Sequence, residues 1–311
     1  MEPFEPAYIK TFEKGLLQEK IKTAHNLLSP CNLCPRKCRV DRLSGETGVC
    51  KTAKRAWVSS YNPHFGEEAP LVGKHGSGTI FFTHCNLMCL FCQNFEISHE
   101  SCGQKVSNEE LAAIMLALQH QGCHNINFVT PSHVVPQILA ALEIAVQQGL
   151  SVPLVYNSGG YDLPSTLRLL EGVFDIYMPD FKFWDPEVAG KLCAAQDYPE
   201  RAREAFKEMH RQVGDLALDD LGIARRGLLV RHLVLPDNLA GTAEVMKFLA
   251  EELSPNTYVN VMAQYRPCGR AFEHPSLGRL PTQQEQLEAQ EAARRAGLSR
   301  LDRREKLFRW L

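Results

Sequence analysis

The distribution of cysteine constrains this chain more than any other feature of its sequence. Seven of the eleven cysteines lie between residues 31 and 92. The N-terminus begins with acidic residues and lacks the apolar stretch of a secretory signal peptide, so we expect a cytoplasmic protein. The cytoplasm keeps thiols reduced, and clustered cysteines there are more often metal ligands than disulfide partners. The two groups of cysteines are therefore candidate metal sites.

The second group has the spacing C-x3-C-x2-C, at Cys85, Cys89 and Cys92, and follows directly on an apolar run. Three thiolates on one short loop can hold three corners of a [4Fe–4S] cluster, which leaves the fourth iron free to bind substrate atoms. Structural zinc prefers four closed ligands. His84 could complete a zinc set, but neighbouring residues of an extended chain point to opposite faces. The spacing favours an open cluster over zinc, an electron-transfer site or three unliganded thiols.

The first group has the spacing C-x2-C-x3-C-x11-C and comprises Cys31, Cys34, Cys38 and Cys50. Four thiolates close a metal site, so this one is expected to be structural or redox-active rather than catalytic. Nearby cations would offset the thiolate charge: Arg36, Lys37, Arg39 and Arg42. The spacing does not separate zinc from a second iron–sulfur cluster. A disulfide pair is one further alternative, and a tie between the N-terminal helix and the rest of the chain, with no part in the chemistry, is another.

Short apolar runs alternate with helical patterns from residue 78 onward. Strands are predicted at residues 79–83, 125–129, 152–156, 174–179, 228–235 and 258–262. Helices are predicted at residues 107–121, 134–148, 164–171, 199–213, 241–253 and 282–297, the first and last opening with capping boxes. Strand–helix units in series predict an α/β fold with a parallel sheet, here a partial (β/α)6-type TIM barrel with its active site at the C-terminal strand ends. An open doubly wound sheet is the alternative.

The residues before the barrel form a separate part of the chain. One amphipathic helix is predicted at residues 8–28, and a segment rich in cysteine, glycine and proline follows it. We therefore divide the chain into an N-terminal helix with a cysteine-rich metal-binding extension at 1–76, and a partial barrel with a C-terminal helical region at 77–311. The net charge of −2 and the absence of a dense basic run predict no nucleic-acid partner. No apolar run is long enough to predict a membrane span.

Several motifs together resemble a known family. The three-cysteine loop, with Phe91 directly before its last cysteine, resembles the signature of the radical S-adenosylmethionine (SAM) superfamily. From about residue 30 to 300 the chain is similar to the pyruvate formate-lyase-activating-enzyme-like (PflX-type) family, through CNLCPRKCRV, HNINFVTPSHVVPQIL, VYNSGGYD, DIYMPDFKF, RRGLLVRHLVLPDN and YVNVMAQYRP. The resemblance implies that SAM chelates the open iron. An electron from the reduced cluster would then cleave SAM into methionine and a 5′-deoxyadenosyl radical, which abstracts hydrogen from a substrate.

Polar residues follow several of the predicted strands. The superfamily usually places Gly-Gly-Glu after the second strand to bind the amino group of SAM, but this chain has Thr130-Pro131 there. We therefore expect the contact to come from backbone carbonyls around Thr130 and Pro131, or from elsewhere in the chain. Asn157 is either a turn cap or a cofactor contact. Asp180 and Lys182 match an Asp-x-Lys of the activating enzymes, which implies contacts to the ribose hydroxyls and the carboxylate of SAM. A surface ion pair is the alternative.

Arg231 and His232 interrupt the apolar run of the fifth strand. Only one of them should point into the barrel, and an inward Arg231 is a candidate carboxylate ligand because buried charge must be paired. His232 is expected to be an ordinary packed histidine. The candidate substrate-side residues after the sixth strand are Gln264, Tyr265 and Arg266. The remaining cysteines are expected to be small core or surface residues: Cys102, Cys123, Cys193 and Cys268.

These features lead to three hypotheses of function. The first is an activase that passes the radical to a glycine of a large partner, a glycyl radical enzyme, although the chain lacks the ferredoxin-like cysteine insertion of some activating enzymes. The second is a stand-alone radical enzyme that modifies a small molecule or a peptide side chain. The third is a non-enzymatic iron–sulfur electron carrier. The first two also imply a reductant such as flavodoxin or ferredoxin as a partner.

Overall fold

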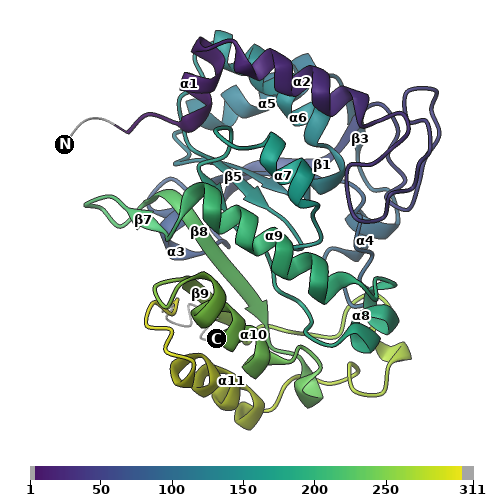
Figure 1. Ribbon diagram of the computed structural model, residues 1–311, viewed down its shortest axis with the longest axis vertical. Helices are drawn as coiled ribbons and strands as arrows, with labels where there is room; N and C mark the ends of the chain where they lie inside the picture. Colours follow the sequence, from purple (N-terminus) through teal and green to yellow (C-terminus); the bar gives the residue numbers. More distant parts are fainter. Residues whose placement is uncertain (1–3, 303–311) are drawn as a thin grey trace.

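Six parallel strands form the centre of the molecule (Figure 1), for which the computed structural model describes residues 4–302. They neighbour one another in chain order: β2 (Ser77–Phe82), β4 (Ile126–Val129), β5 (Leu154–Asn157), β6 (Ile176–Tyr177), β8 (Ala224–Leu233) and β9 (Tyr258–Met262). Each overlaps one predicted strand. The strand order of a doubly wound sheet reverses at a switch point, and this order does not. The predicted α/β fold with a mostly parallel sheet is therefore confirmed, and the doubly wound alternative is wrong.

The predicted helices of the barrel are present as well. They are α5 (Asn108–His120), α6 (Val135–Gln147), α7 (Pro164–Leu169), α9 (Tyr198–Val213), α10 (Thr242–Phe248) and α11 (Gln283–Arg295). Both capping boxes form, at Ser107 before α5 and at Thr282 before α11. The helix predicted to run to residue 253 ends earlier, because its last turn, Leu249–Leu253, is a π-helix.

The N-terminal helix is two helices rather than the single one predicted. α1 (Ala7–Glu13) and α2 (Leu16–Asn26) are separated at Gly15, whose φ of 71° is left-handed. Glycine adopts this conformation without steric cost, and it ends a helix there. α2 packs against α6 and α7, so the N-terminal helices cover the outside of the barrel.

Several elements have no counterpart in the sequence-based prediction. β1 (Ala56–His64) pairs antiparallel with β2, and β3 (Gln104–Val106) pairs with β1. The others are β7 (Ala217–Leu218), α3 (Ala69–Val72), α4 (Phe95–His99) and α8 (Pro186–Cys193). β1 was interpreted as loop because it is polar and partly exposed, as edge strands often are. β1 matters for the site because it ends at His64, beside the C-terminal ends of the parallel strands.

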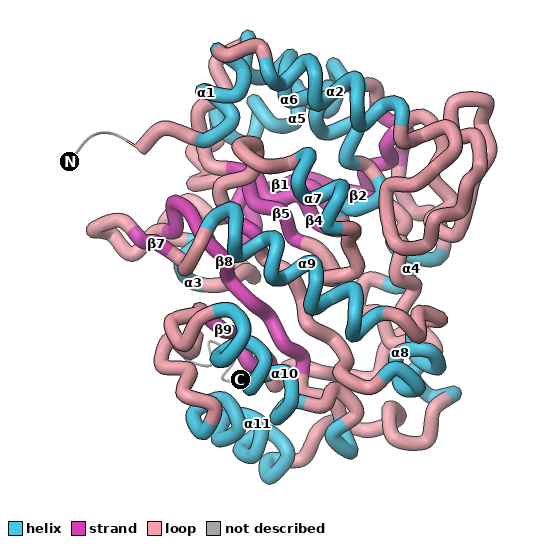
Figure 2. Tube along the Cα trace, in the orientation of Figure 1, coloured by secondary structure: helices cyan, strands magenta, loops and turns pink. Residues whose placement is uncertain are grey.

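The segment between α2 and β1 contains the first cysteine group and consists mainly of loops (Figure 2). Its own apolar cluster is small and centres on Leu28 and Leu33. Arg42 within the segment is buried, 1% exposed, and donates to the carbonyl oxygens of Ala53 and His133. Contacts from buried polar groups therefore join this segment to the barrel. Within residues 4–302, none of the helices combines the length and apolar character that a bilayer span requires.

Tyr198, the first residue of α9, fixes the loops that follow β5 and β6. Its hydroxyl accepts a hydrogen bond from the Lys182 amide N–H at 2.8 Å. It lies 2.9 Å from the Asp180 carbonyl oxygen and 3.0 Å from that of Gly159, and can donate to either. Tyr198 is fully buried, so these groups have little access to water.

We predict that Tyr198→Phe lowers the free energy of unfolding by about 1–3 kcal/mol, because a largely buried amide donor and its neighbouring carbonyl groups lose their partner. Denaturant unfolding of the purified protein measures this. Tyr8→Phe is the matched control, since Tyr8 is equally buried but donates to the single carbonyl oxygen of Val152, at 2.9 Å. An equal loss in both variants would contradict the role of Tyr198.

Candidate functional site

A cavity of about 370 Å³ opens at the C-terminal ends of the parallel strands, where a barrel places its active site. We call it the central cavity. All three cysteines of the second group line it, from the loop after β2. The predicted cofactor-binding residues also line it: Thr130, Asn157, Asp180, Lys182 and Arg231. The fold therefore brings together side chains that lie more than a hundred residues apart in the sequence.

The three-cysteine loop presents thiols rather than charged thiolates when no metal is bound. Burial raises the pKa of Cys85 to about 12 and also raises the pKa of Cys92. A bound metal displaces such protons. His84 is buried, with its ring nitrogens 3.2 Å from the Thr52 hydroxyl and 2.9 Å from the Ser101 hydroxyl. It does not line the central cavity, so its side chain does not join the three thiols.

The donor set fits a cofactor larger than one ion. Among residues 4–302, no group of three or more His, Cys, Asp or Glu side chains could hold a metal ion. The three thiols instead share one wall of a cavity much larger than an ion. Thiolates on such a wall suit three corners of an iron–sulfur cluster, with the open cavity facing the fourth.

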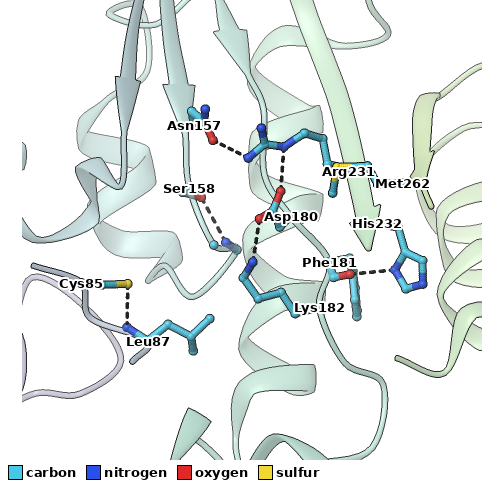
Figure 3. A network of polar contacts seen from close by, with 12 residues as sticks. Cys85, Leu87, Asn157, Ser158, Asp180, Phe181, Lys182, Arg231, His232 and Met262 are labelled. Carbon is cyan, nitrogen blue, oxygen red and sulfur yellow. Dashed lines mark hydrogen bonds and ion pairs between the residues drawn. The ribbon is translucent and has the colours of Figure 1, made fainter. Parts of the chain in front are cut away.

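A charged network forms the opposite part of the cavity (Figure 3). Asp180 accepts from Lys182 Nζ at 2.6 Å and from Arg231 Nε at 2.7 Å. Arg231 Nη2 also donates to Asn157 Oδ1 at 2.6 Å, so the Asn157 side chain is not a simple turn cap. Burial opposes the ionisation of Asp180, yet the two cations hold its pKa below the usual value. The network therefore carries charge in the folded protein.

The side chains of this network are mostly shielded from solvent. Those of Asp180 and Lys182 are 16% and 19% exposed and line the central cavity, so they do not form the surface ion pair given as the alternative. Their roles toward SAM remain predictions. Lys182 also lies close enough to Cys89 for its ammonium to attract a thiolate there. The network thus reaches the cysteine wall.

β8 directs its two polar residues to opposite faces, as alternation along a strand requires. Arg231 faces the central cavity, and His232 points away from it (Figure 3). His232 Nδ1 lies 2.7 Å from the Phe181 carbonyl oxygen, and Nε2 lies 2.9 Å from the Thr242 hydroxyl. Burial lowers the pKa of His232 to about 4, so it is neutral at pH 7.

The predicted substrate-side residues are not brought together. Gln264 lines the central cavity. Tyr265 does not, and this prediction is wrong: the ring is 2% exposed, packs beside Phe91 and donates to the Leu277 carbonyl oxygen at 2.7 Å. Arg266 is exposed and also lies outside the cavity lining. The chain leaves the strand after Met262, so the residues beyond it no longer alternate toward the cavity.

Two glutamates that lie near Arg231 were missed because β1, the strand that precedes them, was not predicted. Glu67 lines the central cavity, and its Oε2 lies 3.3 Å from Arg231 Nη1. Glu68 accepts from Asn260 Nδ2 at 2.8 Å, and its other carboxylate oxygen is buried without a hydrogen-bond partner. The signal available in the sequence was the pair of adjacent acids after a glycine. Glu67 and Asp180 are the carboxylates of residues 4–302 that line this cavity.

α8 supplies a further contact that the sequence did not indicate. Cys193, at its end, is buried as expected of a core residue; its Sγ donates to the Ala189 carbonyl oxygen at 3.1 Å and lies near Cys89. The Leu90 amide donates to the Leu192 carbonyl oxygen at 2.9 Å, which holds α8 against the three-cysteine loop. The loop is therefore supported from behind by the end of α8.

The first cysteine group surrounds a void of its own. All four cysteines, Cys31, Cys34, Cys38 and Cys50, line a void of about 10 Å³. Three of the four nearby cations also line it, namely Arg36, Lys37 and Arg42, whereas Arg39 is exposed and does not. A role for Arg39 in offsetting thiolate charge stays a prediction.

Arg36 connects this void with the three-cysteine loop. Its guanidinium donates to the carbonyl oxygens of Asn86 at 2.8 Å, Leu87 at 3.1 Å and Cys193 at 2.8 Å, and also to that of Ala194. The first two acceptors lie between Cys85 and Cys89 in the sequence. One side chain of the extension therefore helps to shape the loop at the central cavity.

A family model and several known proteins match parts of this chain. A family model described as the Radical SAM superfamily matches residues 79–219. The chain is 33% identical over 294 residues to "Uncharacterized protein MJ0674" of Methanocaldococcus jannaschii, an alignment that covers 91% of this chain and 80% of that protein. Among solved structures, it is similar to methylornithine synthase (PylB), with 15% identity and a TM-score of 0.46. That alignment covers 72% of this chain and 70% of the synthase chain. It is also similar to QueE from Escherichia coli, with 13% identity and a TM-score of 0.32. That alignment covers 64% of this chain and 92% of the QueE chain.

We predict that His232 makes the folded protein less stable in mild acid. Its pKa is about 4 when folded and about 6.5 when unfolded, so between these values the unfolded chain binds more protons and stability falls as the pH falls. The loss attributable to His232 between pH 7 and pH 4.5 is about 2–3 kcal/mol, at about 1.4 kcal/mol per pKa unit.

Urea unfolding of wild type and His232→Gln at the two pH values, in the same metal state, tests this prediction. The variant should lose less stability on acidification than wild type by that amount. His120→Gln, at an exposed position of α5, is the control and should follow wild type. A His232→Gln variant with the full wild-type pH dependence would contradict the assignment.

Proposed function

This chain belongs to the radical SAM superfamily of enzymes, and from that premise we propose that Cys85, Cys89 and Cys92 hold the [4Fe–4S] cluster that binds SAM. The observation that carries the proposal is the position of the three thiols. They lie on one loop, inside the range of the family match, and they open into the cavity at the C-terminal strand ends. When bound and reduced, such a cluster supplies the electron that cleaves SAM into methionine and a 5′-deoxyadenosyl radical.

We assign the charged network to the binding of SAM. Lys182 lies between the cysteine wall and Asp180, so its ammonium can meet a carboxylate held at the open iron. Arg231 positions Asp180, whose carboxylate can accept from ribose hydroxyls. Asn157 holds the other side of the Arg231 guanidinium. For the amino group we propose either backbone carbonyls around Thr130 or the Glu67 carboxylate, since Gly-Gly-Glu is absent after β4.

We propose further that the radical abstracts hydrogen from a polypeptide, as in a glycyl radical activase of the PflX type. Phe65 supports this candidate, because it is 60% exposed and stands between His64 and Gly66, which both line the central cavity. An exposed aromatic ring at a cavity mouth suits docking of a peptide loop. The polar lining supports the second candidate, a stand-alone enzyme for a small molecule or peptide side chain. Membership in an enzyme superfamily contradicts the third hypothesis, a non-enzymatic electron carrier.

The remaining assignments concern cofactors and partners. We propose a flavodoxin or ferredoxin as the reductant, because the cluster must receive single electrons. We also propose a second metal centre at the first cysteine group, as either an iron–sulfur cluster or zinc.

We predict that the anaerobically reconstituted and reduced protein converts SAM into 5′-deoxyadenosine, measured by liquid chromatography. Cys85→Ala should abolish the product, because the cluster loses one of three protein ligands. Cys102→Ala should retain it, since Cys102 is exposed and lies outside the cavity lining. A fully loaded cluster that yields no 5′-deoxyadenosine would refute the proposed function. Deuterium transfer into 5′-deoxyadenosine from a labelled glycyl-loop peptide would favour the activase over the stand-alone enzyme.

We predict that Lys182→Gln weakens the binding of SAM to the cluster-loaded protein by roughly 10- to 100-fold, because a hydrogen bond to a charged group contributes about 1.5–3 kcal/mol. Isothermal titration calorimetry under anaerobic conditions measures the dissociation constant of SAM. Lys191→Gln is the matched control, on the exposed side of neighbouring α8, and should bind SAM as wild type does. Unchanged affinity in Lys182→Gln would remove Lys182 from the binding site.

A further inference from the structure

The first cysteine group is mostly buried and lies beside cationic side chains. Cys31, Cys34 and Cys50 are each 7–8% exposed, and Cys38 is partly exposed. All four are free thiols, so the disulfide alternative does not describe this structure. Their side chains converge on one void from a segment that has only a small apolar cluster to order it.

Two buried or partly buried arginines face this void without an acidic partner. Arg42 is 1% exposed and donates only to the carbonyl oxygens of Ala53 and His133. Arg36 likewise donates to four carbonyl oxygens. Within residues 4–302, no carboxylate lies within ion-pair distance of either guanidinium. A buried cation without a negative neighbour is strongly unfavourable. Thiolates at the void would supply that charge, and thiolates persist there only when they bind a metal.

The arrangement of the four thiols separates the two kinds of metal centre. All four line one void, yet within residues 4–302 no group of three or more His, Cys, Asp or Glu side chains is arranged to hold a single metal ion. A tetrahedral zinc site needs four ligands gathered around one ion, with Zn–S bonds of about 2.3 Å. Thiols that share a void without that arrangement suit a cofactor whose own iron and sulfide atoms lie between them.

We propose that Cys31, Cys34, Cys38 and Cys50 hold a second, fully coordinated iron–sulfur cluster. Four thiolates leave no iron open, so this cluster does not bind SAM. Arg36 and Arg42 balance its charge. Through Arg36 the cluster is linked to the carbonyl groups of Asn86 and Leu87, and hence to the loop of the first cluster. The inference rests on the proposed function only in assigning the first cluster to Cys85, Cys89 and Cys92.

Metal analysis of a variant without the first cluster tests this proposal. The Cys85→Ala/Cys89→Ala/Cys92→Ala protein is reconstituted anaerobically with ferrous iron and sulfide in the presence of equimolar zinc. We expect about four irons and about four sulfides per chain, with the visible absorption of an iron–sulfur cluster. One zinc per chain without sulfide would overturn the proposal, and so would a chain that binds neither metal.

The wild-type protein provides the second measurement, which does not depend on the folding of the triple variant. We expect about eight irons per chain in wild type and about four in Cys34→Ala/Cys38→Ala. Four irons and one zinc in wild type would overturn the second cluster. The iron count and the test of SAM cleavage can fail independently of each other. A protein with eight irons that does not cleave SAM refutes the function alone, and one with four irons and zinc that does cleave SAM refutes the second cluster alone.

Discussion

The pairing of buried charge at Asp180 is the interaction on which the site depends. Asp180 follows β6, and it receives hydrogen bonds from Lys182 of the same segment and from Arg231 of the neighbouring strand β8. Arg231 in turn reaches Asn157 at the end of β5. Because a buried charge is strongly unfavourable once its partner is lost, these strand ends form one unit. The parallel register brings the strand ends together, and the charges then fix their side chains.

The central cavity has two chemically different walls. Thiols from the loop after β2 form one wall, and cations and carboxylates from the later strands form the other. Lys182 stands where the two meet. Chemistry at an open iron needs both the metal ligands and groups that orient the ligand of that iron. Glu67 comes from the segment that follows β1, an antiparallel strand added to the edge of the parallel set, so the site is completed by a part of the chain outside the barrel repeat.

The parts that sequence analysis predicted are those governed by local rules. The capping boxes at Ser107 and Thr282, and the opposite facing of Arg231 and His232, follow from chain geometry alone. β1 was missed because its polar, half-exposed residues become a strand only by pairing with β2. Tyr265 was misplaced for a related reason: after β9 ends, tertiary packing and not alternation decides where a side chain points. The site residues on strands were therefore predictable, and those that depend on loops were not.

In the cysteine-rich extension, two roles that the sequence analysis set as alternatives are compatible. Sequence analysis set a metal site and a simple tie to the barrel as alternatives. In the structure, Arg36 and Arg42 face the void of the four cysteines while their N–H groups donate to carbonyl oxygens of the barrel and its loops. A guanidinium has more donors than one anion needs, so it can balance charge on one side and hold backbone on the other. In the proposed second cluster, charge at the four cysteines would thus stabilise the arginines that fasten the extension. Arg36, through its hydrogen bonds to the carbonyl oxygens of Asn86 and Leu87, also helps to shape the loop that carries the other three cysteines.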